Sequence, residues 1–184
     1  MFSSSAGELQ FTEYGLSGPV IFEISRDVCQ RRGIWLCRLD FLPDMDETAL
    51  KTELLRRKTT NLPASELLTG ILHNRLGRVL TQSAGISQSR MISELTDYEL
   101  GEAVRSVKSF EVALTEPMGM DCAQVTAGGI VTAEFDEQTM ESRLVPDLYA
   151  CGEVLDVDGD CGGYNLQWAW SSGRLAGIHA GGNV

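Results

Sequence analysis

A glycine-rich stretch near the C-terminal end holds the residues best suited to bind a ligand. A short apolar run at residues 148–151 is followed by a turn-rich loop from Gly152 to Gly163, and the pattern predicts a helix from about Asn165. Backbone N–H groups and the positive end of the helix dipole gather where such a helix begins, so this order of strand, loop and helix favours an anion or a carbonyl group as ligand. The structural alternative is a helix that Asn165 simply caps.

Three carboxylates at alternate positions of this loop suggest a metal site at first sight. Asp156, Asp158 and Asp160 match the start of a calcium-binding loop, which then requires Gly at its sixth and Glu at its twelfth position. Cys161 and Gln167 occupy those positions. The sequence therefore predicts a solvated acidic loop and no metal.

Other residue types that could do chemistry form no recognisable arrangement. No two cysteines have CxxC spacing, and His73 and His179 lie in no ligand-like cluster. This argues against structural zinc and a disulfide framework and is typical of a reducing cytoplasm. No spacing links a serine to a histidine and a carboxylate, so the catalytic residues stay unknown.

Charge and hydropathy exclude several classes of partner for the chain. Its 184 residues carry a formal net charge of -11, which repels nucleic acid and anionic lipid. No apolar run approaches the roughly 20 residues that span a bilayer. We therefore expect neither nucleic acid nor a membrane as partner, and the cysteine usage favours a cytoplasmic protein.

The elements that must position the glycine-rich stretch begin with strands and one helix. Alternating or β-forming residues predict strands at 8–12, 34–42 and 110–114. A tight turn is expected at 15–19, with Ser17 capping a helix that carries Pro19 in its first turn.

Between the second and third of these strands the pattern becomes helical. Asp44 or Asp46 can cap a helix through about Lys58. A second helix is predicted from residues 61–63 to Leu80, and a third begins at a capping box. The box is formed by Thr96 and Glu99.

Two groups of glycines predict close approach of backbones. Gly128 and Gly129 interrupt predicted strands at 122–127 and 130–135, which indicates a bulge or a close approach of the backbone to a ligand. Ala169, Gly173 and Gly177 form a smooth stripe on the C-terminal helix, as expected where a helix lies tightly on a sheet. A single strand–loop–helix unit cannot make a doubly wound sheet, so we expect the chain to be a fragment of a larger protein.

Three stretches carry a resemblance to a known family. They are GELQFTEYGLSGP at 7–19, VTAGGI at 125–130, and the long stretch at 148–177 that includes GEVLDVDGDCGGYNLQWAWSSG. Together they resemble the BaiN/YhiN-like flavoproteins, which are NAD(P)/FAD-dependent oxidoreductases with aminoacetone-oxidase-like and bile-acid-reductase-like members.

The resemblance implies a mixed α+β fold in which an insert interrupts a Rossmann-like FAD domain. It implies a β-barrel-like insert domain at 1–43 and 109–137, a small three-helix subdomain at 44–108, and the C-terminal strand–loop–helix of the FAD domain at 138–184. The N-terminal FAD-domain segment, which would hold the pyrophosphate loop, would be a missing partner.

The resemblance also implies a cofactor site. FAD would be bound in the complete protein, with NAD(P)H as a candidate reductant. Gly152 and Glu153 would lie at the ribityl chain, and the turn of Thr126, Gly128 and Gly129 would border the flavin. The pyrimidine edge of the isoalloxazine would be lined by Gly163, Tyr164, Asn165, Leu166 and Gln167. The turn at 15–18 would lie near the substrate space.

The resemblance implies a fragment of an FAD-dependent oxidoreductase that transfers a hydride between flavin and a small organic substrate, inactive when alone. The alternative is a stand-alone substrate- or partner-binding module. One departure stands out, because family members often carry His where this chain has Glu13.

Overall fold

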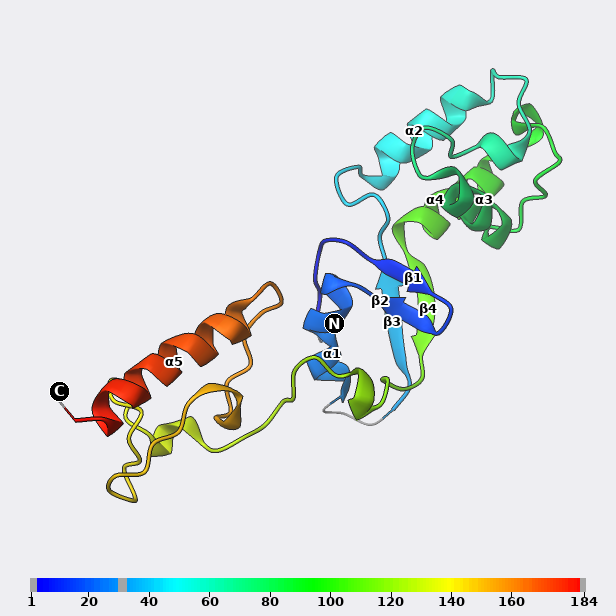
Figure 1. Cartoon of the computed structure of the whole chain (residues 1–184). Helices are drawn as coiled ribbons and strands as arrows, with labels where there is room; N and C mark the ends of the chain where they lie inside the picture. The colour runs from blue at the N-terminus through cyan, green and yellow to red at the C-terminus, as the bar shows by residue number, and fades with distance from the viewer. Residues whose placement is uncertain (1–2, 30–32, 183–184) are drawn as a thin grey trace. The chain divides into compact units, whose positions relative to one another are not determined.

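The computed structural model describes residues 3–29 and 33–182 (Figure 1). They form two compact units. One unit comprises Ile34–Thr115, and the other combines Met1–Gly33 with Glu116–Val184.

The unit 34–115 contains a two-stranded antiparallel sheet. Strand β3 (Trp35–Leu39) pairs with β4 (Phe110–Leu114) in a register that places Trp35 opposite Leu114 and Leu39 opposite Phe110. Burial alternates along both strands, which confirms the predicted strand pattern. The predicted strand at 34–42 is shorter than expected, because Phe41 N–H donates to Val107 O and turns the chain towards the helices.

The helices of this unit lie between the two strands in sequence and gather beyond one end of the sheet (Figure 1). They are α2 (Glu47–Arg57), α3 (Asn74–Ser83) and α4 (Asp97–Lys108), with the 3₁₀ turns η1 (Ala64–Glu66) and η2 (Ile92–Glu94) between them. Their apolar faces meet in one core. Its buried members are Leu50, Leu54, Ala64, Leu67, Leu68, Leu80, Ile86, Ile92, Leu95, Leu100, Ala103, Val104 and Val107.

Two predicted helix caps are confirmed by their hydrogen bonds. Asp46 accepts from Ala49 N–H at 2.7 Å and begins α2. At α4, Thr96 Oγ1 accepts from Glu99 N–H at 3.2 Å, and Glu99 Oε2 accepts from Thr96 N–H at 2.8 Å. Each box member satisfies a backbone donor that the first helical turn leaves without a partner.

The capping box gives a pH-dependent contribution to stability. The Thr96 N–H and then the Arg90 guanidinium stabilise the ionised Glu99 side chain and lower its pKa from 4.5 to about 2. Because the pKa is lower in the folded state, this stabilisation is present above about pH 4.5 and is lost as the pH falls towards 2. We expect Glu99→Gln to destabilise the chain most near neutral pH and progressively less on acidification.

Urea unfolding at a series of pH values measures this gap in unfolding free energy. Glu102→Gln is the matched control, since Glu102 lies on the same helix and pairs with the exposed Arg105, an ion pair that contributes little. A gap for Glu99→Gln that stays constant down to about pH 2 would contradict the prediction.

The predicted second helix is wrong as one continuous element. Gly70 has a left-handed backbone (φ 79°) that ends the segment beginning at η1, and α3 starts anew at Asn74. Arg57 supports the break from α2, because its Nη1 donates to Leu67 O at 3.0 Å and to Thr69 O at 2.7 Å. The apolar spacing that suggested one helix instead serves the turn and α3, which both face the same core.

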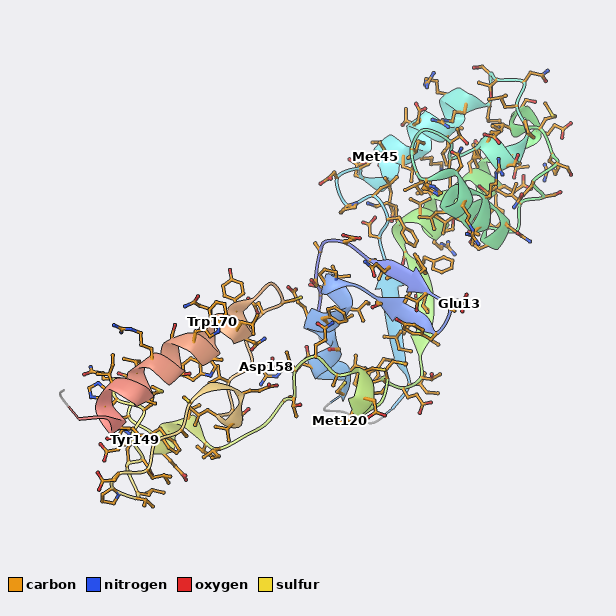
Figure 2. All side chains as sticks on the ribbon, viewed as in Figure 1. Glu13, Met45, Met120, Tyr149, Asp158 and Trp170 are labelled. Carbon is orange, nitrogen blue, oxygen red and sulfur yellow. The ribbon has the colours of Figure 1, made fainter. Side chains whose placement is uncertain are left out.

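The other unit begins with a small hairpin. Strands β1 (Gln10–Thr12) and β2 (Gly15–Ser17) pair antiparallel, and α1 (Pro19–Cys29) follows. Glu13 lies in the turn of this hairpin (Figure 2). The tight turn expected at 15–19 is therefore mostly strand, and Gly18 makes the change of direction into α1 with a left-handed φ of 100°.

The C-terminal part of this unit is formed by short turns and one long helix. The turns are η3 (Met120–Cys122), η4 (Thr132–Glu134) and η5 (Gly152–Val154), and α5 (Tyr164–Ala180) follows as predicted. A small core of Phe135, Met140, Leu155 and Ala176 joins α5 to the preceding loop. Within residues 3–29 and 33–182, none of the helices has the length and apolar character that a bilayer crossing requires.

The strands predicted at 122–127, 130–135 and 148–151 are wrong. Residues 122–127 take part in no bridge within the described part of the chain. The other two segments pair only at single positions, such as the parallel bridge of Ile130 with Leu155 and the antiparallel bridge of Glu141 with Tyr149. A strand needs a neighbour along its whole length, and β-forming residues without one adopt bends and turns.

Candidate functional site

The turn that contains Gly128 and Gly129 lies directly against η5. Ile130 N–H donates to Val154 O at 2.8 Å, and Asp156 N–H donates to Ile130 O at 2.9 Å. A Cβ on Gly129 would come within 2.7 Å of Val154 O, so only glycine permits this contact. The close approach predicted for the glycine pair is present, but its partner is the protein backbone at 154–156 instead of a ligand.

A side chain joins the other end of the same turn to η5. Thr126 N–H donates to Glu153 Oε1 at 2.8 Å. Thr126, Gly129 and Glu153 were predicted as flavin-site residues from separate stretches of sequence, and the structure brings them together in one place.

Gly152 is fixed from α5 by two side chains. Its N–H donates to Ser172 Oγ at 2.9 Å, and Trp168 Nε1 donates to its carbonyl oxygen at 3.0 Å. Gly152 itself is left-handed, with φ 71°. Neither Trp168 nor Ser172 is predicted from the sequence as a supporting residue of the site. The available signal was a serine one turn below Trp168 on a helix face of small residues, since a buried hydroxyl needs a hydrogen-bond partner.

The start of α5 presents backbone donors to open space. Gly162 and Gly163 are left-handed, with φ 119° and 99°, and no atom lies within 4 Å of the position of a Cβ on either one. The first intrahelical bond runs from Gln167 N–H to Gly163 O at 3.0 Å. The N–H groups of Tyr164, Asn165 and Leu166 precede it and have no acceptor within the helix.

Two of the predicted site side chains make contacts inside the protein. Asn165 Oδ1 accepts from Gly159 N–H at 2.9 Å, and its Nδ2 donates to Gly159 O at 3.0 Å. Gln167 Nε2 donates to Ser171 Oγ at 2.9 Å. The simple cap expected from Asn165 is wrong, because Gly163 occupies the cap position and Asn165 closes the acidic loop onto the helix.

We expect Asn165→Ala to open this loop. It removes both bonds to Gly159, whereas Asn165→Asp keeps the acceptor and loses the donor. Hydrogen–deuterium exchange of the Gly159 amide should be about tenfold faster in the alanine variant, since one hydrogen bond is worth roughly 1 kcal/mol, and intermediate in the aspartate variant. Unchanged exchange in Asn165→Ala would contradict the loop-closing role.

Only part of the stripe of small residues on α5 makes the close backbone contact that was predicted. A Cβ on Gly173 would approach Cys151 Sγ at 3.9 Å, and Ala169 lies beside Gly152, but no atom lies within 4 Å of a Cβ on Gly177. The helix therefore packs on η5 and the residue before it, and not on a sheet, in the described part. Among the described residues, those of the acidic loop included, no three His, Cys, Asp or Glu side chains form a group that could hold a metal ion.

A glycine-rich turn that opens a long helix is a feature of nucleotide-binding α/β domains, because the helix start offers free backbone N–H groups to an anion. The chain belongs to the HI0933-like family. Residues 99–179 match the HI0933-like protein Rossmann domain, and residues 3–125 match the HI0933-like protein barrel and H2TH domain. The resemblance to BaiN/YhiN-like flavoproteins and the mixed α+β fold class are thereby confirmed.

Three curated relatives align with nearly the whole chain. A 3-dehydro-bile acid delta(4,6)-reductase of Clostridium scindens is 38% identical over 184 positions, covering 96% of this chain and 44% of the relative. Ribosomal RNA dihydrouridine synthases of Escherichia coli and Haemophilus influenzae are 36% and 33% identical, covering 89% and 90% of this chain and 40% of each relative. The chain thus spans less than half the length of these relatives.

Proposed function

We propose that this chain is part of an FAD-dependent oxidoreductase that transfers a hydride between flavin and a small organic substrate. The observation that carries the proposal is the junction of the turn at 126–129 with η5, which brings together predicted flavin-site residues from separate stretches of the sequence. The identity to a reductase along 96% of the chain supports the same class of activity.

The residues present fit a flavin. Gly162 and Gly163 leave open space beside the helix start, where a flat ring system could lie against the backbone without meeting a side chain. The N–H groups of Tyr164, Asn165 and Leu166 face the same end of the helix, where the dipole favours negative charge.

FAD supplies the hydride or electron pair in this chemistry. The start of α5 would stabilise the negative charge that develops at N1 and O2 of the reduced flavin, and the turn at 126–129 would border the flavin. We propose NAD(P)H as reductant. The family often carries His where this chain has Glu13, so that either Glu13 substitutes for this His in proton transfer or the chemistry differs.

The charges favour a small substrate over ribosomal RNA, although two relatives are named for RNA. The segment 116–184 holds eleven carboxylates and only Arg143 and Arg174 as cations. In the unit 34–115, eight of ten cationic side chains already form ion pairs within the unit. Binding to a phosphate backbone requires cations that are free to replace its counterions.

The proposed partner within the protein is the N-terminal FAD-domain segment. Large apolar side chains on and near α5 are exposed, among them Trp170 at 68% and Leu166 at 61% (Figure 2). Burying such side chains stabilises an interface by about 25 cal/mol per Å² of apolar surface.

We also propose the domain bounds that the resemblance implies. They are the FAD-domain part at 138–184, the insert at 1–43 and 109–137, and the helical subdomain at 44–108. We propose a cytoplasmic location for the protein.

The decisive experiment is a chimera in which this chain replaces the aligned stretch of the Clostridium scindens reductase. We expect a yellow protein with the visible absorption bands of oxidised flavin, bleached by a nicotinamide reductant. A folded but colourless chimera would favour the alternative, a binding module without catalytic activity. Retention of a ribosomal RNA fragment by the chimera, at physiological salt, would contradict the small-substrate proposal.

A further inference from the structure

Glu153 connects η5, which side chains of α5 hold in place, to the turn at 126–129. The residue before it, Gly152, is bonded through its N–H to Ser172 and through its carbonyl oxygen to Trp168. The backbone of Glu153 is therefore fixed from α5, and its carboxylate reaches across to Thr126 N–H at 2.8 Å.

The turn that Glu153 reaches is held differently at its two ends. Ile130 uses both its N–H and its C=O in backbone bonds to Val154 and Asp156, at 2.8 and 2.9 Å. Between the two ends Gly128 is left-handed, and no atom lies within 4 Å of a Cβ on it. At the Thr126 end the backbone N–H is held by a side chain, so the position of this end depends on the carboxylate of Glu153.

We propose that Glu153 is a positioning residue that sets the turn at 126–129 against η5 by accepting from Thr126 N–H. The consequence is that Glu153 acts on the flavin through the backbone of this turn. This consequence rests on the proposed flavin function. Both residues are exposed, and a charged acceptor makes a shorter and stronger bond than a neutral one.

Hydrogen–deuterium exchange of the 184-residue chain tests the contact itself. In Glu153→Ala the Thr126 amide should exchange about tenfold faster, since it loses one charge-assisted bond. Glu153→Gln keeps a carbonyl acceptor and should recover most of the protection. Glu137→Ala, which removes an exposed carboxylate of the same segment, should leave Thr126 unchanged.

The amides of Ile130 and Asp156 report the integrity of the segment in the same experiment. Their exchange should stay unchanged in Glu153→Ala, because their bonds lie at the other end of the turn. Equal acceleration at Thr126, Ile130 and Asp156 would mean that the whole segment opens and would overturn the proposal. Unchanged exchange of Thr126 would also overturn it.

The chimera with the Clostridium scindens reductase tests the consequence for the flavin. Glu153→Ala should shift the visible flavin bands and the reduction potential, while Glu153→Gln stays close to the unmutated chimera and Glu137→Ala does not differ from it. Bands and potential that do not move in Glu153→Ala, although Thr126 loses protection, would overturn the action on the flavin. A chimera without flavin would refute the proposed function, whereas the exchange experiment would still decide the contact between Glu153 and Thr126.

Discussion

Replacing Gly129 with alanine is expected to separate the turn at 126–129 from η5. The new Cβ would lie 2.7 Å from Val154 O and 2.8 Å from both Asp156 N and Leu155 C, and all three are backbone atoms that cannot rotate away. Overpacking costs about 1–3 kcal/mol, and the two backbone bonds of Ile130 add about 1 kcal/mol each if they break. We expect a local loss of about 3 kcal/mol.

Exchange of the Ile130 and Asp156 amides measures this loss directly. A change of about 3 kcal/mol in local opening corresponds to acceleration by about two orders of magnitude. Gly119→Ala is the matched control, because Gly119 lies earlier in the same segment with φ −65° and has no atom within 4 Å of a Cβ. If the Ile130 and Asp156 amides exchanged at the same rate in both variants, the contact between Gly129 and the backbone at 154–156 would be less tight than the structure indicates.

The second large effect is expected in the helical core of the unit 34–115. Leu54 on α2 is fully buried at 0% exposure, whereas its neighbour Leu55 is 38% exposed. Leu54→Ala removes buried methyl groups and leaves a cavity, at a cost of about 2–5 kcal/mol, while Leu55→Ala should cost less than about 1 kcal/mol.

This pair of variants changes the same residue type at adjacent positions of one helix, so helix propensity is the same for both. Urea unfolding followed by far-ultraviolet circular dichroism gives the two free energies. Equal destabilisation by the two variants would show that α2 does not bury the face that contains Leu54. The comparison also separates the stability of this unit from any effect at the turn 126–129 and η5, which lie in the other unit.

Local sequence signals predicted the elements whose stability comes from their own residues. The caps at Asp46 and Thr96 fix where α2 and α4 begin, because a side-chain oxygen three residues from a backbone donor needs no help from elsewhere in the chain. The alternation in 110–114 predicted β4 for a similar reason, since each strand of the pair exposes one face. The glycine pair before Tyr164 correctly indicated the start of α5.

The secondary-structure predictions were wrong where contacts with residues distant in sequence decide the conformation of a segment. The apolar spacing at 61–80 fits a continuous helix, but the left-handed Gly70 and the bonds from Arg57 divide it. The β-forming runs around Gly128 and before Gly152 have no strand beside them along their length, so they remain turns with single bridges. Neither outcome can be derived from periodicity, because it depends on contacts between residues distant in sequence.

The sequence by itself determined the family, the glycine turns and the helix that would face a flavin, because these depend on residue types at fixed local spacing. Only the tertiary structure decided what those residues contact. It directed the Asn165 side chain to Gly159, placed Gly129 against the backbone of η5, and joined Glu153 to Thr126, which lies 27 positions earlier. The physical reason is that a hydrogen bond between distant residues depends on how two separately folded turns are held together, and here Trp168 and Ser172 of α5 hold one of them.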